Sequence, residues 1–193
     1  MANFTEKAIK ESFIKLLNEK PLNKISVKDI VEDCGINRNS FYYHFENIPA
    51  LLEKIITDET STIIQKYPTI NSLDECFHTA FEFALQNKKA AFHIYNSVSR
   101  DVFERELMKL CDYAVNTYMK NAFAQKEIND ADHTILMRFI KCECFGLIIE
   151  WLNSGMDDDA IHDLLRITEL CRGFSAELIR RSQPNNQVSR QPS

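Results

Sequence analysis

The stretch from residue 26 to residue 45 constrains this chain more than any other part of its sequence. Ser26 is a favoured N-cap, and Asp29 three residues later completes an acidic form of the capping box. Gly35 then interrupts the helix, because glycine adopts positive φ without steric cost. The stretch is therefore predicted to form two short helices joined by a tight turn.

The second of these helices has one aromatic side and one polar side. Asn37 is a good N-cap, and Phe41 and Phe45 lie four residues apart, so they point inward together. A short helix that is anchored by its apolar side and polar outside suits the major groove of DNA. The candidate DNA-contacting residues of the two helices are Ser26, Lys28, Asn37, Arg38, Asn39, Ser40, Tyr42, Tyr43 and His44.

The alternative for this stretch is an ordinary helical hairpin in a bundle, with its aromatic residues as core. The run from 41 to 45 is aromatic throughout, so Phe41 and Phe45 cannot share one buried face with all three of the residues between them. The stretch also follows directly after an amphipathic helix, as a three-helix DNA-binding unit requires. Both features favour DNA binding.

From about Phe4 to Leu52 the chain resembles the TetR family of transcriptional regulators. The most specific part of the resemblance is Phe41-Tyr42-Tyr43-His44-Phe45, placed shortly after the Gly35-Ile36-Asn37 turn. The resemblance implies an all-α fold with an N-terminal three-helix helix-turn-helix DNA-binding domain and a C-terminal helical domain for ligand binding and dimerisation. It also implies a homodimer, most often a repressor that a small molecule releases from a palindromic operator in double-stranded DNA.

Each candidate residue has an expected role. Arg38 and Asn39 are predicted to read base edges, since Arg pairs with guanine and Asn with adenine. The resemblance makes Tyr42 and His44 phosphate contacts, and Tyr43 a contact to phosphate or to a thymine methyl. Ser26 and Lys28 would reach the DNA backbone. Ser26 has the alternative role of a plain helix cap, and His44 that of a structural hydrogen-bonding group.

Composition limits the fold class and the compartment. The chain has 193 residues, 45% of them hydrophobic, with only 4 glycines, 5 prolines and no long alternating strand pattern. These features predict an all-α protein with a sizeable core. No run approaches the roughly 18 apolar residues of a membrane span, and the N-terminus has no secretory core. We therefore expect a soluble, cytoplasmic protein without a membrane partner.

The net charge of −5 is unevenly distributed. Residues 1–47, which we call the head, carry 7 Lys/Arg and 7 Asp/Glu, whereas residues 48–193 carry 16 and 21. The acidic remainder is expected to lie away from DNA. Binding should depend on Lys28, Arg38, Lys24 and the dipoles of helix N-termini, with modest non-specific affinity.

Further helices are expected along the chain. The predicted ranges are Phe4–Asn18, Ile48–Lys66, Leu73–Gln86, Lys88–Val98, Arg100–Ala124, 131–153 and a last helix from about 157–159 to Arg181. Three parts follow from this pattern: the head, a helical ligand-binding and dimerisation domain at 48–181, which we call the body, and a disordered polar tail at 182–193.

The segment 131–153 is apolar on several faces, so it must bury against more than one neighbour. With the last helix it is predicted to form the homodimer interface, through residues 131–181. Its end, with Glu150-Trp151-Leu152 before Ser154-Gly155-Met156, faintly resembles the C-terminal part of a TetR subgroup that includes dihydroxyacetone-kinase regulators.

The body offers candidates for a ligand pocket, although a plain core role is favoured for each. Neither a metal nor a cofactor is predicted. The candidates are Phe77, Phe81, Tyr95, Phe103, Tyr113, Tyr118 and Met137.

The cysteine pattern gives no sign of a disulfide framework or a zinc site. Positions 34, 76, 111, 142, 144 and 171 include no CxxC pair and no matching histidine spacing. Reduced, mostly buried thiols are predicted, and redox sensing is an alternative without specific support. Cys142 and Cys144 should project about 200° apart around their helix.

Three classes of function are compatible with the sequence. The first is a dimeric repressor released by a small-molecule effector. The second is a transcriptional coactivator of the dihydroxyacetone-kinase-regulator kind, whose signal comes from a protein partner. The third, an enzyme, is not predicted, because the chain has no nucleophile motif, phosphate loop or paired carboxylates. An enclosed cavity would favour the small molecule, and a dry core with an exposed apolar patch would favour the partner.

Overall fold

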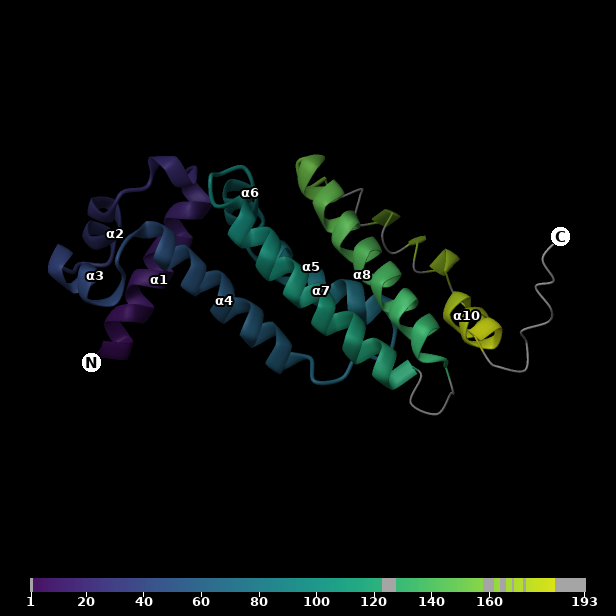
Figure 1. Ribbon diagram of the computed structural model, residues 1–193. Helices are drawn as coiled ribbons and strands as arrows, with labels where there is room; N and C mark the ends of the chain where they lie inside the picture. The colour runs from purple at the N-terminus through teal and green to yellow at the C-terminus, as the bar shows by residue number, and fades with distance from the viewer. Residues whose placement is uncertain are drawn as a thin grey trace. The chain divides into compact units, whose positions relative to one another are not determined.

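The computed structural model describes residues 2–122, 128–157, 162–163, 166–167, 169–171 and 173–182. Every regular element in these residues is helical, which confirms the all-α class (Figure 1). None of these helices is both long and apolar enough to cross a membrane. The elements are α1 Ala2–Glu19, the 3-10 helix η1 Leu22–Lys24, α2 Val27–Asp33, α3 Arg38–His44, α4 Ile48–Lys66, α5 Leu73–Gln86, α6 Lys88–Tyr95, α7 Arg100–Ala122, α8 Asp130–Asn153 and α10 Phe174–Ser182.

Two predicted helices end differently in the structure. The helix predicted over Lys88–Val98 ends at Tyr95, because the Ser97 hydroxyl donates to the carbonyl of Ile94 at 2.6 Å and turns the chain. The predicted last helix is not continuous to Arg181. Cys171 and Gly173 lie in a turn, Gly173 has φ +86°, and α10 begins only after it. A left-handed glycine is a common helix end.

Some predictions fall partly outside the described residues. Asp157 lies in a loop, where its carbonyl accepts a hydrogen bond from Trp151 Nε1 at 2.9 Å, whereas residues 158 and 159 are not described. Residues 123 and 124 and residues 183–193 of the predicted tail also lie outside the described residues. Ser182, the first residue of that predicted tail, is the last residue of α10.

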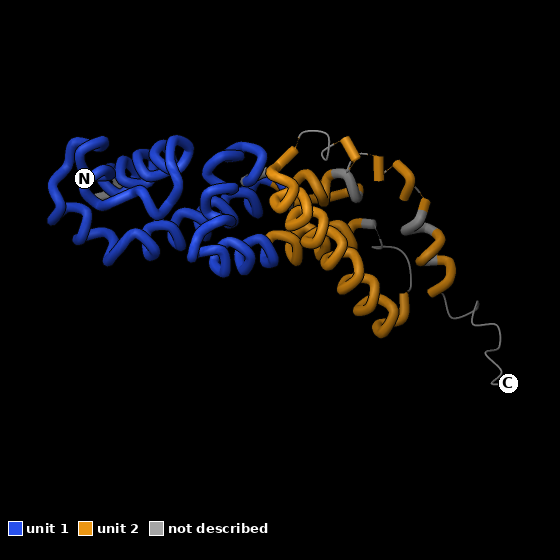
Figure 2. The backbone as a smooth tube through the Cα atoms, turned by 90° about the horizontal axis from the view of Figure 1, so that it is seen from above, with its two compact units in different colours: residues 1–66, 81–109 blue, residues 67–80, 110–193 orange. Residues whose placement is uncertain are grey.

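The chain divides into two compact units (Figure 2). Unit 1 comprises Met1–Lys66 and Phe81–Lys109, and unit 2 comprises Tyr67–Ala80 and Leu110–Ser193. Within unit 1, α1 packs against α2, α3 and α6. Unit 2 has its own apolar cluster, formed by Ile70, Cys76, Ala114, Val115, Tyr118, Met119 and Ile140.

The head is built around the buried stripe of α1. Ile9, Phe13, Leu16 and Leu17 are all buried, as their helical spacing predicts. The Ser12 hydroxyl, buried beside them, donates to the carbonyl of Ile30 on α2 at 3.3 Å. These contacts give α2 and α3 a fixed apolar support.

The turn between α2 and α3 depends on one glycine. Gly35 has φ +69°, and the Ile36 N–H donates to the carbonyl of Val31 at 3.0 Å. This bond closes the helix end in the manner of a Schellman motif. A Cβ on Gly35 would meet no atom within 4 Å, so the requirement for glycine lies in the backbone alone.

Replacing Gly35 by alanine should therefore destabilise the protein without any clash. The expected loss in the free energy of unfolding is about 1–2 kcal/mol, the cost of a left-handed conformation for a residue with a Cβ. Gly35→Asn should lose less, because asparagine tolerates this conformation. Urea unfolding followed by circular dichroism measures both, and equal stability of Gly35→Ala and the parent protein would contradict the argument.

Candidate nucleic-acid interface

The first turn of α2 is closed by a complete capping box. The Ser26 hydroxyl accepts a hydrogen bond from the Asp29 backbone N–H at 3.2 Å, and Asp29 Oδ2 accepts one from the Ser26 N–H at 2.8 Å. The Ser26 hydroxyl also donates to Asp29 Oδ2 at 2.7 Å, and these bonds lower the pKa of Asp29. Ser26 is thus a helix cap in the free protein, and its predicted DNA contact stays a prediction.

The first turn of α3 uses two more of the candidate residues. Asn37 Oδ1 accepts hydrogen bonds from the Ser40 N–H at 2.8 Å and from the Ser40 hydroxyl at 3.1 Å. On the opposite side of the helix, Phe41 is fully buried and Phe45 is 6% exposed. The predicted cap and the predicted anchor of α3 are both present.

The outer side of α3 presents the residues expected to meet DNA. Arg38 and Asn39 are exposed in the first turn, and the Tyr42 and Tyr43 side chains are 55% and 79% exposed. His44 is half-buried, and its ring meets the edge of Tyr43 at a centroid distance of 5.0 Å. The helix carries no acidic residue that would repel phosphate.

Most cations of the head are already paired with carboxylates. Five of its seven Lys/Arg residues form ion pairs. Lys7, Lys10 and Lys28 each pair within their own helix, and Lys10, Lys15 and Lys20 each pair with a carboxylate of α2 or α4. Lys15 on α1 pairs with Asp33, and Lys20, directly after α1, pairs with Asp29, so both cations are held by carboxylates of α2. Lys28 pairs more loosely with Glu32, at 3.7 Å.

Lys24 and Arg38 are the two head cations that lack a carboxylate partner among the residues described here. Both are exposed. The interhelical pairs of Lys15 and Lys20 were not foreseen from the sequence, because their partners lie 18 and 9 residues away with no local signal. Few cations are therefore free to meet phosphate.

The pocket candidates of the body lie in both units and serve as core or internal contacts. In unit 1, Phe81, Tyr95 and Phe103 are buried, and the Tyr95 and Phe103 rings meet edge to face at 6.3 Å. In unit 2, Tyr118 belongs to the apolar cluster with Met137 packed against it, and Phe77 is half-buried. The Tyr113 hydroxyl, also in unit 2, donates to the carbonyl of Tyr67 at 2.7 Å.

All six cysteines are free thiols, but only three are buried. Cys76 on α5, Cys111 on α7 and Cys144 on α8 are each fully buried in unit 2. Hydrogen bonds with the Cys111 and Cys76 thiols raise the pKa of Cys144 well above its usual range, and burial adds to this effect. Cys142 is exposed, as its place opposite Cys144 on the helix predicts.

Two family models match this chain, one over its N-terminal part and one over its C-terminal part. Residues 14–55, which contain α2 and α3, match the model described as bacterial regulatory proteins, tetR family. Residues 71–173 match a model described as a transcriptional regulator C-terminal region of the same family. The chain belongs to the TetR family of transcriptional regulators.

One curated relative and one solved structure extend this result. An uncharacterised HTH-type transcriptional regulator of Bacillus subtilis (strain 168), YxbF, is 22% identical over 174 residues. That match covers 80% of this chain but only 41% of YxbF, so the chain spans less than half the length of that relative. The dihydroxyacetone kinase operon activator DhaS matches with a TM-score of 0.66 at 18% identity, covering 86% of this chain and 97% of its own, which shows a shared fold.

The two unpaired cations should differ in what they contribute to DNA binding. Arg38→Ala is expected to weaken specific binding by about 1–3 kcal/mol and to relax the preference at one base pair, because it removes the predicted bidentate contact to guanine. Lys24→Ala should weaken all sequences alike, as the loss of a phosphate contact does. Binding titrations against a panel of single-base operator variants measure both, and a uniform loss for Arg38→Ala would make it a phosphate contact instead.

Proposed function

We propose that this TetR-family regulator is a homodimeric, sequence-specific repressor that binds a palindromic operator in double-stranded DNA through α3 of each subunit. The observation that carries the proposal is the surface of α3. Its first turn exposes Arg38 and Asn39, its last turn exposes Tyr42 and Tyr43, and its apolar side is buried. We assign base reading to Arg38 and Asn39 and phosphate contacts to Tyr42 and His44.

The homodimer is supported by an uncharged stripe on α8. Ile135 and Phe139 are 63% and 47% exposed, and Cys142 and Gly146 are exposed beside them. Successive spacings of four, three and four residues place all four on one side of the helix. Two of them are small, so a second helix can approach closely. A stripe of this kind on a regulator is typical of a subunit interface.

The residues after α8 add to the same argument. Ile167 and Leu170 are 38% and 66% exposed. They lie within the range 131–181 that the sequence assigns to the interface. We propose that α8 and these residues contact their counterparts across a two-fold axis, with residues 1–47 as the DNA-binding domain and 48–181 as the ligand-binding and dimerisation domain.

One contact between the body and the head offers a route by which an effector signal would reach the DNA-binding domain. His93 on α6 donates from Nδ1 to the carbonyl of Leu17 on α1 at 2.6 Å. That carbonyl lies at the end of α1, where the next partner along the helix would be Pro21, which has no N–H to donate. A movement of α6 would thus be transmitted directly to the head.

The test is to select DNA from a random-sequence duplex library with the purified full-length protein, and then to footprint the enriched sequence. A two-fold-symmetric site is expected, with half-sites about 34–36 Å apart or a multiple of that distance. A reporter whose promoter overlaps this site should be silenced by the protein. Enrichment of no sequence, or of a single unrepeated element, would contradict the proposed function.

Phe139→Glu should convert the dimer into a monomer, because it places a carboxylate within the uncharged stripe on α8. Glu143→Ala changes an exposed residue of the same helix outside the stripe and should leave the dimer intact. Light scattering coupled to size exclusion gives the mass of each variant. A dimer that persists in Phe139→Glu would place the subunit interface elsewhere.

A further inference from the structure

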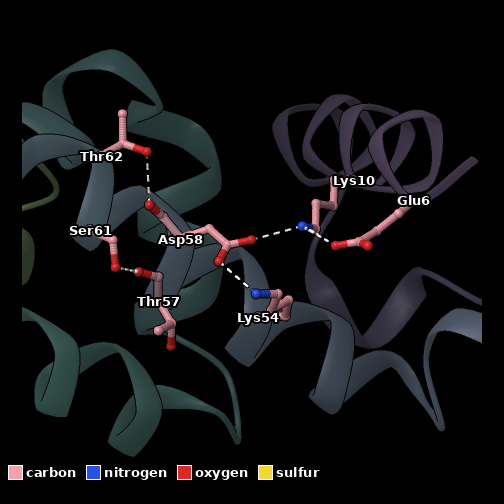
Figure 3. Close-up of polar contacts among 7 residues, drawn as sticks. All are labelled: Glu6, Lys10, Lys54, Thr57, Asp58, Ser61 and Thr62. Carbon is pink, nitrogen blue, oxygen red and sulfur yellow. Dashed lines mark hydrogen bonds and ion pairs between the residues drawn. The ribbon is translucent and has the colours of Figure 1, made fainter. Parts of the chain in front are cut away.

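Four charged side chains form a connected set of ion pairs between the head and α4, the helix that follows it (Figure 3). Lys10 on α1 donates from Nζ to Glu6 at 2.5 Å and to Asp58 on α4 at 2.7 Å. The other oxygen of Asp58 accepts from Lys54, one turn earlier on α4, at 2.8 Å. Lys10 thus lies between two carboxylates, one from its own helix and one from α4.

Three of these side chains are partly buried. The side chains of Lys10 and Glu6 are 21% and 31% exposed, and that of Asp58 is 40% exposed. Burial alone would lower the pKa of Lys10, but its hydrogen bonds to Asp58 and Glu6 raise it above the usual value. Burial alone would raise the pKa of Asp58, but its bonds from Lys10 and Lys54 lower it. The attraction between the partners therefore exceeds the cost of their burial.

A second ion pair holds α4 from another side. Glu53 accepts a hydrogen bond from Arg105 Nη2 on α7 at 2.5 Å. The Nε of Arg105 also lies 3.6 Å from Glu106, a buried carboxylate that pairs with Lys109 at 2.7 Å. Positions 53 and 58 are about 140° apart around the helix axis. Ion pairs thus tie α4 to α1 on one side and to α7 on another.

The direction of α4 affects the position of the recognition helix, because α4 begins only a few residues after α3. Only residues 45–47 separate His44, at the end of α3, from Ile48, at the start of α4. A rotation of α4 about this short link would change where the head stands relative to the rest of its own subunit. In a dimer it would change the distance between the two recognition helices.

We propose that Lys10 and Asp58 are positioning residues for DNA binding: their ion pair fixes the angle between the head and α4 and so sets the spacing of half-sites that the dimer accepts. The inference rests on the proposed homodimeric function. It requires no contact between either residue and DNA. What it predicts is a change in spacing discrimination, defined as the ratio of affinities for the selected operator and for operators whose half-sites are moved by one base pair.

The experiment compares Lys10→Met and Asp58→Asn with the matched control Lys54→Met. The control removes a cation from the same carboxylate but breaks only a bond within α4. Lys10→Met and Asp58→Asn should each reduce spacing discrimination on the order of three- to tenfold, and the double variant should show no further loss, since both break one coupling. Lys10→Arg should retain it, whereas Lys54→Met should match the parent protein.

A single half-site duplex provides the readout that separates positioning from damage to the head. Affinity for it should be the same in all five variants and in the parent protein. Unchanged spacing discrimination in Asp58→Asn, whose side chain has the shape of the original, would overturn the proposal even if Lys10→Met disturbs α1. Equal effects of Lys10→Met and Lys54→Met would overturn it as well. Failure of the parent protein to select any operator would instead count against the proposed function.

Discussion

The candidate DNA-binding surface of α3 depends on the burial of Phe41 and Phe45. A helix of seven residues such as α3 is too short to be stable by itself in water, so its conformation must come from packing. Fully buried Phe41 and nearly buried Phe45 supply that packing on one side. The polar residues on the other side are held in place as a consequence, although they make few contacts of their own.

Two side-chain caps and one glycine turn also stabilise α2 and α3. The Ser26 and Asn37 side chains each satisfy a backbone N–H in the first turn of a short helix, and Gly35 lets the chain turn between the two helices. These three features help to set the angle between α2 and α3. They also engage Ser26, Asn37 and Ser40 in hydrogen bonds, whereas Arg38, Asn39 and the two tyrosines are the exposed side chains of α3.

The charged residues of the head pair mainly with other residues of the protein. The head has equal numbers of cationic and anionic residues, and most of its lysines bind carboxylates of their own helix, of α2 or of α4. Such pairs orient helices but leave little positive charge for phosphate. We therefore expect hydrogen bonds and the shape of α3 to contribute more to DNA recognition than long-range attraction. In our proposal, the Lys10–Asp58 pair fixes the angle between the head and α4.

The sequence by itself determined the helical class, the caps of α2 and α3, the turn at Gly35 and the inward face of α1 and α3. These features follow from residues three or four positions apart, where helix geometry leaves little choice of partner. The turn before α10 also had a local signal, Gly173, which the sequence interpretation missed. Tertiary structure alone decided that Lys10 binds Asp58, 48 residues away, and that His93 reaches Leu17, 76 residues away. A long charged side chain has many carboxylates within possible reach, and only the packing of helices selects one of them.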